Sequence, residues 1–335
     1  MKKINVAVVG LGYWGPNLVR NFLKIPDVRV VAVCDLFEKN LNKISTTFPL
    51  IKATKNYKYI INDKTIDLIA IATPLKTHFL LAKNALLANK HVFIEKPMTE
   101  TSKQGEELIR IAENNKKLIM VGHTFVYTEA VRKIKQIIGK RKLGKIYYYD
   151  STRINLGLIQ PDTNVIWDLA VHDLSILNYI FPAKPVSLLA FGSSYINKQH
   201  AELAHLIIKF QNNISAHIHV SWLSPLKIRK ILIGGSKKMI VYDDIEPSEK
   251  IRVYDKNVTI HPSKITPFSP AYRNGDVVIP HLEQNEALYN QLYHLIDCIR
   301  NRRQSLTDGK EGLKIVKLLE ACDVSLKSNS EVILK

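Results

Sequence analysis

Short apolar runs alternate with amphipathic stretches through the first third of the chain. The apolar runs predict buried strands over residues 6–9, 28–34, 51–53, 66–72, 91–94 and 117–121. The amphipathic stretches predict helices from Gly15 onward and over residues 38–47, 76–88 and 102–114. Strands that alternate with helices are typical of a parallel, doubly wound sheet with right-handed crossovers. We therefore expect an α/β domain over residues 1–123.

After about residue 124 the pattern changes to many successive strand-like runs. Strands are predicted over 145–152, 186–191, 204–210, 214–222, 227–233, 238–242 and near 251–253, and helices over 129–138, 165–180, 283–302 and 310–326. The proline-rich stretch 263–280 is expected to be a loop or arm. Residues 124–335 therefore predict an α+β domain with a large, mostly antiparallel open sheet, and the last helix is a candidate to pack back on the first domain.

The stretch V-A-V-V-G-L-G-Y-W-G, residues 6–15, predicts a strand, a glycine turn and a helix start. Gly10 would allow the tight turn, Gly12 the approach of a pyrophosphate, and Gly15 close packing of helix on strand. The helix N-terminus would offer N–H groups and a positive dipole end to the phosphates. Asp35 ends the second strand, where its carboxylate can accept the ribose hydroxyls and repel a 2′-phosphate. These features predict a Rossmann domain that binds NAD in preference to NADP, because Leu36, and not an arginine, follows Asp35.

Composition describes a globular chain of 335 residues, 46% apolar and 23% charged, long enough for two domains. No apolar run reaches the roughly 20 residues that a membrane span needs, and the start reads as a strand and not a signal peptide. Three widely spaced cysteines suit reduced thiols, so we expect a cytoplasmic protein. The net charge of +18 is scattered over the length, without the aromatic and basic platform of a nucleic-acid binder. It fits either a lysine-rich proteome or an anionic small substrate.

Asp168 and His172 stand four residues apart on a predicted helix, so they share one face. A carboxylate beside an imidazole orients the ring and supports its protonated form. An acid in the first turn of a helix and a packed histidine would give the same spacing, so this pair alone leaves both interpretations open.

Lys96 stands between Glu95 and Pro97 at the end of a predicted strand. A residue before proline is held extended, which would fix the direction of the lysine, and the peptide bond can be cis at modest cost. A surface lysine at a strand exit is the alternative interpretation.

His217 and His219 lie on one face of another predicted strand, with no third ligand nearby in the sequence. We therefore expect a structural or substrate-facing role for them and no metal site.

Several stretches match a known family. They are G-L-G-Y-W-G at 10–15, A-T-P-L-K-T-H at 72–78, E-K-P at 95–97, G-H-T-F-V-Y at 122–127, D-L-A-V-H-D at 168–173 and T-D-G-K-E-G-L-K at 307–314. Together they resemble the glucose-fructose oxidoreductase / inositol dehydrogenase / MocA-like family of NAD(P)-dependent oxidoreductases, over nearly the whole chain. E-K-P followed by D-x-x-x-H is the most specific combination.

The resemblance implies an N-terminal Rossmann domain and a C-terminal α+β domain whose open sheet builds homo-oligomers, dimers or tetramers. It also implies a cis peptide before the proline of E-K-P. By position, Lys96 matches the lysine near the reacting carbon, and Asp168 and His172 match the acid and histidine that complete the catalytic site. The implied cofactor-binding positions are Gly10, Gly12, Tyr13, Trp14, Gly15, Asp35, Thr73, Pro74, His78, Glu95 and Lys96. Our choices for substrate contacts are His123, Tyr127, Arg153 and Asn155, together with Asp168 and His172.

Within the family, Y-W-G-P-N-L-V-R-N-F at 13–22, H-T-F-V-Y at 123–127 and R-I-N-L-G at 153–157 look like the branch that acts on nucleotide-linked sugars. The resemblance then implies hydride transfer at C3 of the sugar, in surface polysaccharide or amino-sugar biosynthesis, with no nucleic-acid partner and no membrane insertion. An inositol or free-polyol dehydrogenase is the alternative within the family. A non-catalytic dinucleotide-binding module is the alternative from another class. Either His172 or Lys96 could act as the base.

Overall fold

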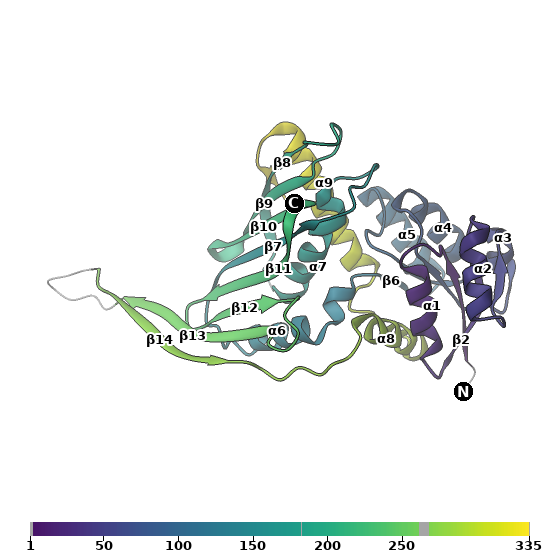
Figure 1. Ribbon diagram of the computed structural model, residues 1–335, viewed down its shortest axis with the longest axis horizontal. Helices are drawn as coiled ribbons and strands as arrows, with labels where there is room; N and C mark the ends of the chain where they lie inside the picture. Colours follow the sequence, from purple (N-terminus) through teal and green to yellow (C-terminus); the bar gives the residue numbers. More distant parts are fainter. Residues whose placement is uncertain (1–2, 182, 261–267, 335) are drawn as a thin grey trace. The chain divides into compact units, whose positions relative to one another are not determined.

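A computed structural model describes residues 3–181, 183–260 and 268–334 of the chain. The chain forms two compact units, each described separately below (Figure 1). Unit 1 comprises residues 1–128 and 285–317, and unit 2 comprises residues 129–284 and 318–335.

Unit 1 is built on a parallel six-stranded sheet with the order β3-β2-β1-β4-β5-β6. Apart from Asn5 and His91, the central strands are buried runs of apolar side chains, as expected for a sheet with helices on both faces. The strands are β1 (Ile4–Val9), β2 (Val28–Cys34), β3 (Lys52–Thr54), β4 (Leu68–Ile71), β5 (His91–Ile94) and β6 (Ile119–Val121). The helices between them are α1 (Gly15–Leu23), α2 (Glu38–Thr47), α3 (Tyr57–Asn62), α4 (Leu75–Leu87) and α5 (Ser102–Asn114).

The later segments of unit 1 are η1 (Thr124–Tyr127), α8 (Ala287–Asn301) and the first part of α9 (Gly309–Ser328). Glycine allows α9 to approach the sheet closely, since a Cβ on Gly312 would lie 2.6 Å from Cγ2 of Val121. Unit 1 therefore draws on residues far from its first strand in the sequence.

Unit 2 contains a nine-stranded sheet with the order β14-β13-β12-β11-β7-β10-β9-β8-β15. All neighbouring strands are antiparallel except β7 and β10, which run parallel. The strands are β7 (Ile146–Leu156), β8 (Pro185–Ser193), β9 (Leu203–Phe210), β10 (Ile214–Ser221), β11 (Leu223–Gly235), β12 (Met239–Asp243), β13 (Ile251–Ile260), β14 (Pro270–Val278) and β15 (Val332–Ile333).

One face of this sheet is covered by helices. Burial alternates along β9 and β10, so every second side chain enters the core, as in a sheet with one covered face. Phe181, just after α7 (Val171–Ile180), packs edge-on against Tyr149 and Phe210 from the covered face. The remaining helical segments of unit 2 are α6 (Glu129–Gly139), the π-helical turn η2 (Ile166–Ala170) and the short η3 (Gln211–Asn213).

The expected fold class is confirmed: a doubly wound parallel sheet and a large, mostly antiparallel sheet. The expected loop over 263–280 is wrong for residues 270–278, which form β14 and pair with β13, while residues 263–267 lie outside the described residues. The loop was predicted because prolines usually interrupt strands. Pro270, however, is the first residue of β14, a position that tolerates proline. The sequence analysis also missed α3 and β15, which are only six and two residues long.

Among the described residues, no helix combines the length and the apolar character that crossing a membrane requires.

Candidate active site

The glycine turn after β1 has the shape that a dinucleotide-binding turn requires. Gly10 has φ of +89°, and a Cβ there would lie 2.5 Å from the Ala72 carbonyl oxygen. A Cβ on Gly15 would lie 2.0 Å from the Gly10 carbonyl oxygen. Gly12, in contrast, has nothing within 4 Å of its Cβ position, so its backbone stays open to a ligand. The fold itself requires Gly10 and Gly15, while Gly12 leaves room for the pyrophosphate of NAD.

Asp35 lies beside this turn at the end of β2. Its Oδ2 accepts a hydrogen bond of 2.6 Å from the Leu11 N–H, and its Oδ1 accepts from the Phe37 N–H at 2.8 Å. The Asn40 amide also donates to Oδ1 at 3.2 Å. These bonds hold the carboxylate at the carboxyl end of the strand, and Oδ2 keeps a lone pair for a ribose hydroxyl. Leu36 and Phe37 are largely exposed and bring no cation to this position. The residues present therefore fit NAD.

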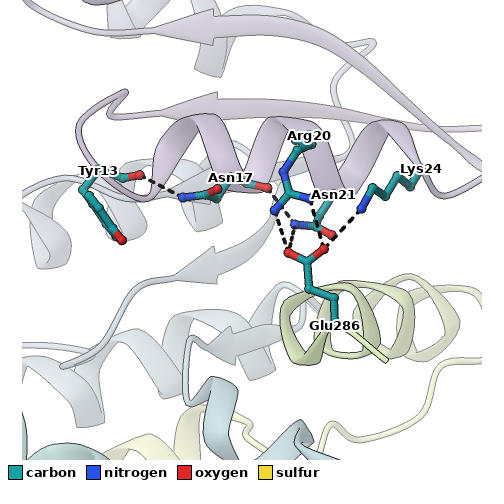
Figure 2. Close-up of polar contacts among 6 residues, drawn as sticks. All are labelled: Tyr13, Asn17, Arg20, Asn21, Lys24 and Glu286. Carbon is teal, nitrogen blue, oxygen red and sulfur yellow. Dashed lines mark hydrogen bonds and ion pairs between the residues drawn. The ribbon is translucent and has the colours of Figure 1, made fainter. Parts of the chain in front are cut away.

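Glu286, which the sequence analysis did not single out, ties the start of α8 to α1. Its carboxylate accepts hydrogen bonds from Arg20 at 2.6 and 3.1 Å, from Asn21 at 2.8 Å and from Lys24 at 3.2 Å (Figure 2). The hydrogen bond from Arg20 is the main reason that the pKa of Glu286 falls to about 2. No sequence signal could find this cluster, because Glu286 is more than 260 residues away from Arg20, Asn21 and Lys24.

A chain of side-chain amides continues from Glu286 toward the glycine turn. The buried Asn21 amide also donates to the Asn17 carbonyl at 3.0 Å, and the Asn17 amide donates to the Tyr13 carbonyl at 3.1 Å (Figure 2). Tyr13 and Trp14 are 82% and 41% exposed in the turn, so their rings are accessible to a ligand. Glu286 is thereby connected to the backbone that would hold the pyrophosphate.

Lys96 stands at the carboxyl end of β5, and its peptide bond to Pro97 is cis, as the resemblance implied. The buried His78 lies between two carbonyl oxygens, with Nδ1 2.9 Å from that of Pro97 and Nε2 2.8 Å from that of Thr73. Burial lowers the pKa of His78, so the neutral ring donates to one of these carbonyls. His78 thus fixes the turn that carries Lys96, and Pro74 caps the helix α4 that carries His78.

Glu95 and His123 are buried beside Lys96. Burial raises the pKa of the Glu95 carboxyl to about 7, against the opposing attraction of Lys96, and a 3.3 Å bond from the Lys96 N–H reaches its Oε2. Burial lowers the pKa of His123 to about 3, and neither of its ring nitrogens has a hydrogen-bond partner within the described residues. A neutral, buried imidazole without a partner is rare in proteins and is typical of a group that meets a ligand or an ordered water.

Tyr127 is fully buried, and its hydroxyl lies 3.3 Å from that of Thr307 inside unit 1. This burial does not support the substrate contact expected for Tyr127 and is explained by packing alone.

Asp168 and His172 come from the segment where η2 passes into α7. The expected α-helix over 165–180 therefore begins with a π turn, which is frequent at functional sites. Trp222, which is 1% exposed, donates its indole N–H to Asp168 Oδ2 at 3.1 Å. The structure adds Trp222 to the candidate site as the residue that orients Asp168.

Arg153 is on the covered face of the sheet and not on an open surface. Its guanidinium forms a buried pair with Asp173, with Nε–Oδ2 at 2.6 Å, and Ser151 donates to the same carboxylate at 2.6 Å. From the sequence, Arg153 was expected to contact the substrate. In the structure its guanidinium is paired with Asp173 in the core. Asn155, two residues further along β7, stays a candidate for substrate contact.

The candidate residues thus form two groups, one within each unit. In unit 1, the glycine turn, Asp35, Thr73, Pro74, Glu95, Lys96 and His123 follow the carboxyl ends of parallel strands, and His78 lies in the first turn of α4. Unit 2 holds Asp168, His172 and Trp222. That Lys96 meets Asp168 and His172 stays a prediction from the family resemblance.

Within the described ranges, no group of three or more His, Cys, Asp or Glu side chains is arranged to hold a metal ion. His217 and His219 do have a histidine neighbour that the sequence did not indicate. His205 on β9 stacks on His219 with ring centroids 4.3 Å apart, and its Nδ1 lies 3.3 Å from Nε2 of His217.

Comparisons with known proteins agree with this geometry. Residues 4–123 match the model of an oxidoreductase family with an NAD-binding Rossmann fold, and residues 131–241 match the GFO/IDH/MocA C-terminal domain. The chain is 22% identical to a UDP-N-acetylglucosamine 3-dehydrogenase from Acidithiobacillus ferrooxidans, over 94% of this chain and 95% of that protein. It is 23% identical to a scyllo-inositol 2-dehydrogenase (NAD⁺) from Bacillus subtilis, over 89% and 87% of the two chains.

Among solved structures, an NAD-binding protein from Listeria innocua superposes with a TM-score of 0.84. That structure is 22% identical in sequence and covers 99% of this chain and 97% of its own. The conclusion rests on the turn geometry, the two-sheet fold and the matches to both family domains. The chain belongs to the GFO/IDH/MocA family and is an NAD-dependent oxidoreductase that acts on CH–OH groups.

Proposed function

We propose that this NAD-dependent oxidoreductase transfers a hydride between the nicotinamide and C3 of a nucleotide-linked sugar, in cytoplasmic surface-polysaccharide or amino-sugar biosynthesis. The observation that carries the proposal is the placement of Lys96. It stands at the carboxyl end of β5, held by the His78–Pro97 bond and next to the buried Glu95 and His123. Ligands of doubly wound sheets bind at this edge.

In the proposed reaction, the enzyme positions a secondary alcohol and accepts the proton of its hydroxyl group. NAD, when bound, supplies the hydride chemistry. His172, oriented by Asp168, takes the hydroxyl proton, because an imidazole can exchange protons at neutral pH. Lys96 hydrogen-bonds the same oxygen and stabilises its developing negative charge. The alternative assignment gives Lys96 the role of base.

Two features favour a nucleotide-linked substrate over a free polyol. The net charge of +18 would attract a diphosphate, and one full-length relative is a UDP-N-acetylglucosamine 3-dehydrogenase. An inositol dehydrogenase is the second candidate, because a relative of similar identity and coverage acts on scyllo-inositol.

Replacement of the proposed catalytic residues tests this mechanism. Lys96→Ala and His172→Ala should each lower the turnover number on the order of a hundredfold or more, because each removes a group that acts on the reacting oxygen. NAD binding, followed by calorimetry, should change little in His172→Ala, which separates a lost proton transfer from a lost cofactor site. A variant that keeps most of the wild-type turnover would contradict the assignment of its residue.

We also propose that the uncovered face of the unit 2 sheet joins copies of the chain into a homo-oligomer. Phe191 and Ile207 on this face are 50% and 39% exposed, and Phe191 pairs across the strands with His205 of the histidine group. Light scattering after gel filtration should give an oligomer for the wild type and a smaller species for Phe191→Asp. The matched control Leu50→Asp, at a fully exposed position of unit 1, should keep the wild-type mass. A monomeric wild type would overturn this proposal.

A further inference from the structure

Two neighbouring cavities lie in unit 1, away from the residues assigned to the cofactor. The larger has a volume of about 840 Å³ and the smaller about 510 Å³. They share His91, Lys117 and Ile299 as walls, so they lie side by side and are together called here the amino-edge groove. Each of the two volumes is in the range of small-molecule sites.

The groove follows the amino ends of the parallel strands. Its wall includes Lys3 before β1, Asp67 before β4, Lys90 before β5 and Lys117 before β6. The glycine turn and Lys96 lie at the opposite, carboxyl ends. A strand of four residues such as β5 spans about 13 Å, so the groove is a separate place from the cofactor site.

The wall of the groove is strongly cationic. It contains eight lysines and arginines against three carboxylates: Lys3, Lys64, Lys90, Lys116, Lys117, Arg302, Arg303 and Lys310 against Asp67, Glu113 and Asp308.

Three of these cations already form hydrogen bonds or ion pairs within unit 1. Lys90 donates to the carbonyls of Asp63 and Ile66, Arg303 pairs with Asp297, and Lys310 pairs with Glu113.

The carboxylates on the wall are occupied as well. Asp67 accepts a hydrogen bond of 2.9 Å from the Asn5 N–H, and Asp308 accepts from the Glu311 N–H at 2.9 Å. In contrast, Lys3, Lys64, Lys116, Lys117 and Arg302 form no ion pair within the described residues. The groove therefore presents five cations that form no ion pair with a carboxylate.

Two of these five residues occupy backbone positions that glycine normally fills. Lys116 follows the end of α5 with φ of +53°, and Arg302 is the C-cap of α8 with φ of +50°. A non-glycine residue in this left-handed region costs roughly 1 kcal/mol or more. The negative end of a helix dipole attracts cations anywhere in the last turn of the helix. This attraction therefore does not explain why the cations stand at these two left-handed positions. Placing both charges at these two positions brings them to the wall of one cavity.

His91 adds a neutral donor to the shared wall. Its Nδ1 accepts a hydrogen bond of 3.0 Å from the Leu118 N–H, so the ring proton is on Nε2. Burial, helped by the charge of Lys117, lowers the pKa of His91 to about 4, and the ring is neutral at physiological pH. The wall thus combines cations with an N–H donor, the groups that bind phosphate oxygens.

We propose that the amino-edge groove binds a small anion with two or more phosphate groups, at a site separate from the cofactor site. The cations are divided along its length, with Lys116 and Arg302 in the larger cavity, Lys3 and Lys64 in the smaller and Lys117 between them. Linked phosphates can contact more of these side chains than a single phosphate does. The site does not depend on the identity of the sugar substrate.

Calorimetric titration of inorganic pyrophosphate into protein saturated with NADH tests the proposal, because the nicotinamide cofactor then fills the other phosphate-binding turn. One molecule should bind per chain, more tightly than orthophosphate, and with an affinity that falls as salt rises. Lys117→Glu should weaken binding about tenfold or more, because it reverses the charge shared by both cavities. Lys43→Glu, at an α2 lysine outside the groove, is the matched control and should change the affinity less than about twofold.

Arg302→Asn serves as a second variant, since asparagine tolerates the left-handed backbone and should leave the thermal midpoint unchanged. It should weaken pyrophosphate binding several-fold. The proposal is overturned if the NADH-loaded protein shows no saturable pyrophosphate binding up to about 10 mM. Equal loss of affinity in Lys117→Glu and Lys43→Glu would also overturn it, since it would mean that only the net charge matters. Neither result bears on sugar turnover, so failure here leaves the proposed function standing.

Discussion

Replacing Glu95 by glutamine should stabilise the protein at alkaline pH while leaving it unchanged in acid. Glu95 is 8% exposed, and among the described residues its carboxylate accepts one weak hydrogen bond, from the Lys96 N–H. Burial raises its pKa from 4.5 in the unfolded chain to about 7 in the folded one. The folded state therefore binds the proton more tightly than the unfolded state. This contribution to stability is fully present below pH 4.5 and is lost as pH rises through about 7.

The size of the effect follows from the pKa difference. A change of one pKa unit corresponds to about 1.4 kcal/mol, so the shift from 4.5 to about 7 amounts to about 3 kcal/mol. Glutamine keeps the shape and the acceptor oxygen but cannot ionise. We therefore expect the free energy of unfolding of Glu95→Gln, relative to wild type, to rise by up to about 3 kcal/mol between pH 4 and pH 8.

Urea denaturation of the NAD-free protein, followed by tryptophan fluorescence at several pH values, measures this difference. The control is Glu106→Gln, which removes an exposed ion pair with Lys317 and should change stability by at most about 1 kcal/mol at any pH. The reasoning is refuted if the difference between Glu95→Gln and wild type is the same at both ends of the pH range. A fall in the relative stability of the variant as pH rises would reverse the sign and refute it as well.

Three further substitutions test other parts of the structure. Glu286→Gln should weaken NAD binding by about threefold to tenfold in calorimetry with little change in the turnover number, because it loosens the amide chain to the glycine turn; an unchanged affinity would show that Glu286 serves only to dock α8. Arg153→Met should lower the free energy of unfolding by about 3–5 kcal/mol, since it leaves the Asp173 carboxylate buried without its cation, and adding Asp173→Leu should recover most of the loss. A double variant as unstable as the single one would contradict this. Trp222→Phe should lower the turnover number about tenfold with a small change in the thermal midpoint, because it removes the hydrogen bond to Asp168, and full activity would exclude that role.

Features set by local pattern could be predicted from the sequence. The parallel sheet, the glycine turn and the position of Lys96 at a strand end follow from apolar runs that stop at polar residues. The carboxyl ends of parallel strands share one edge, so the sequence indicated that Gly10, Asp35, Thr73 and Glu95 lie there.

Features that depend on distant partners could not be predicted. Glu286 contacts α1 across more than 260 positions of sequence, and His205 joins His219 only because β9 and β10 pair in one register. Arg153 looked available for substrate, but the alternation of β7 places it on the covered face against Asp173. The five cations of the amino-edge groove come from four separate segments of the chain, so in the sequence they look like scattered surface charge.

A substrate panel with NAD, followed by nicotinamide absorbance, tests the central claim most directly. It contains UDP-N-acetylglucosamine, its uronate, UDP-N-acetylgalactosamine, dTDP-glucose, myo-inositol and glucose, with Lys96→Ala as the inactive control. We expect reduction of NAD with one nucleotide-linked sugar and none with free polyols; if the whole panel is silent, the matching 3-keto sugars with NADH should be reduced instead. Turnover of inositol or glucose without turnover of any nucleotide-linked sugar would contradict the proposed function.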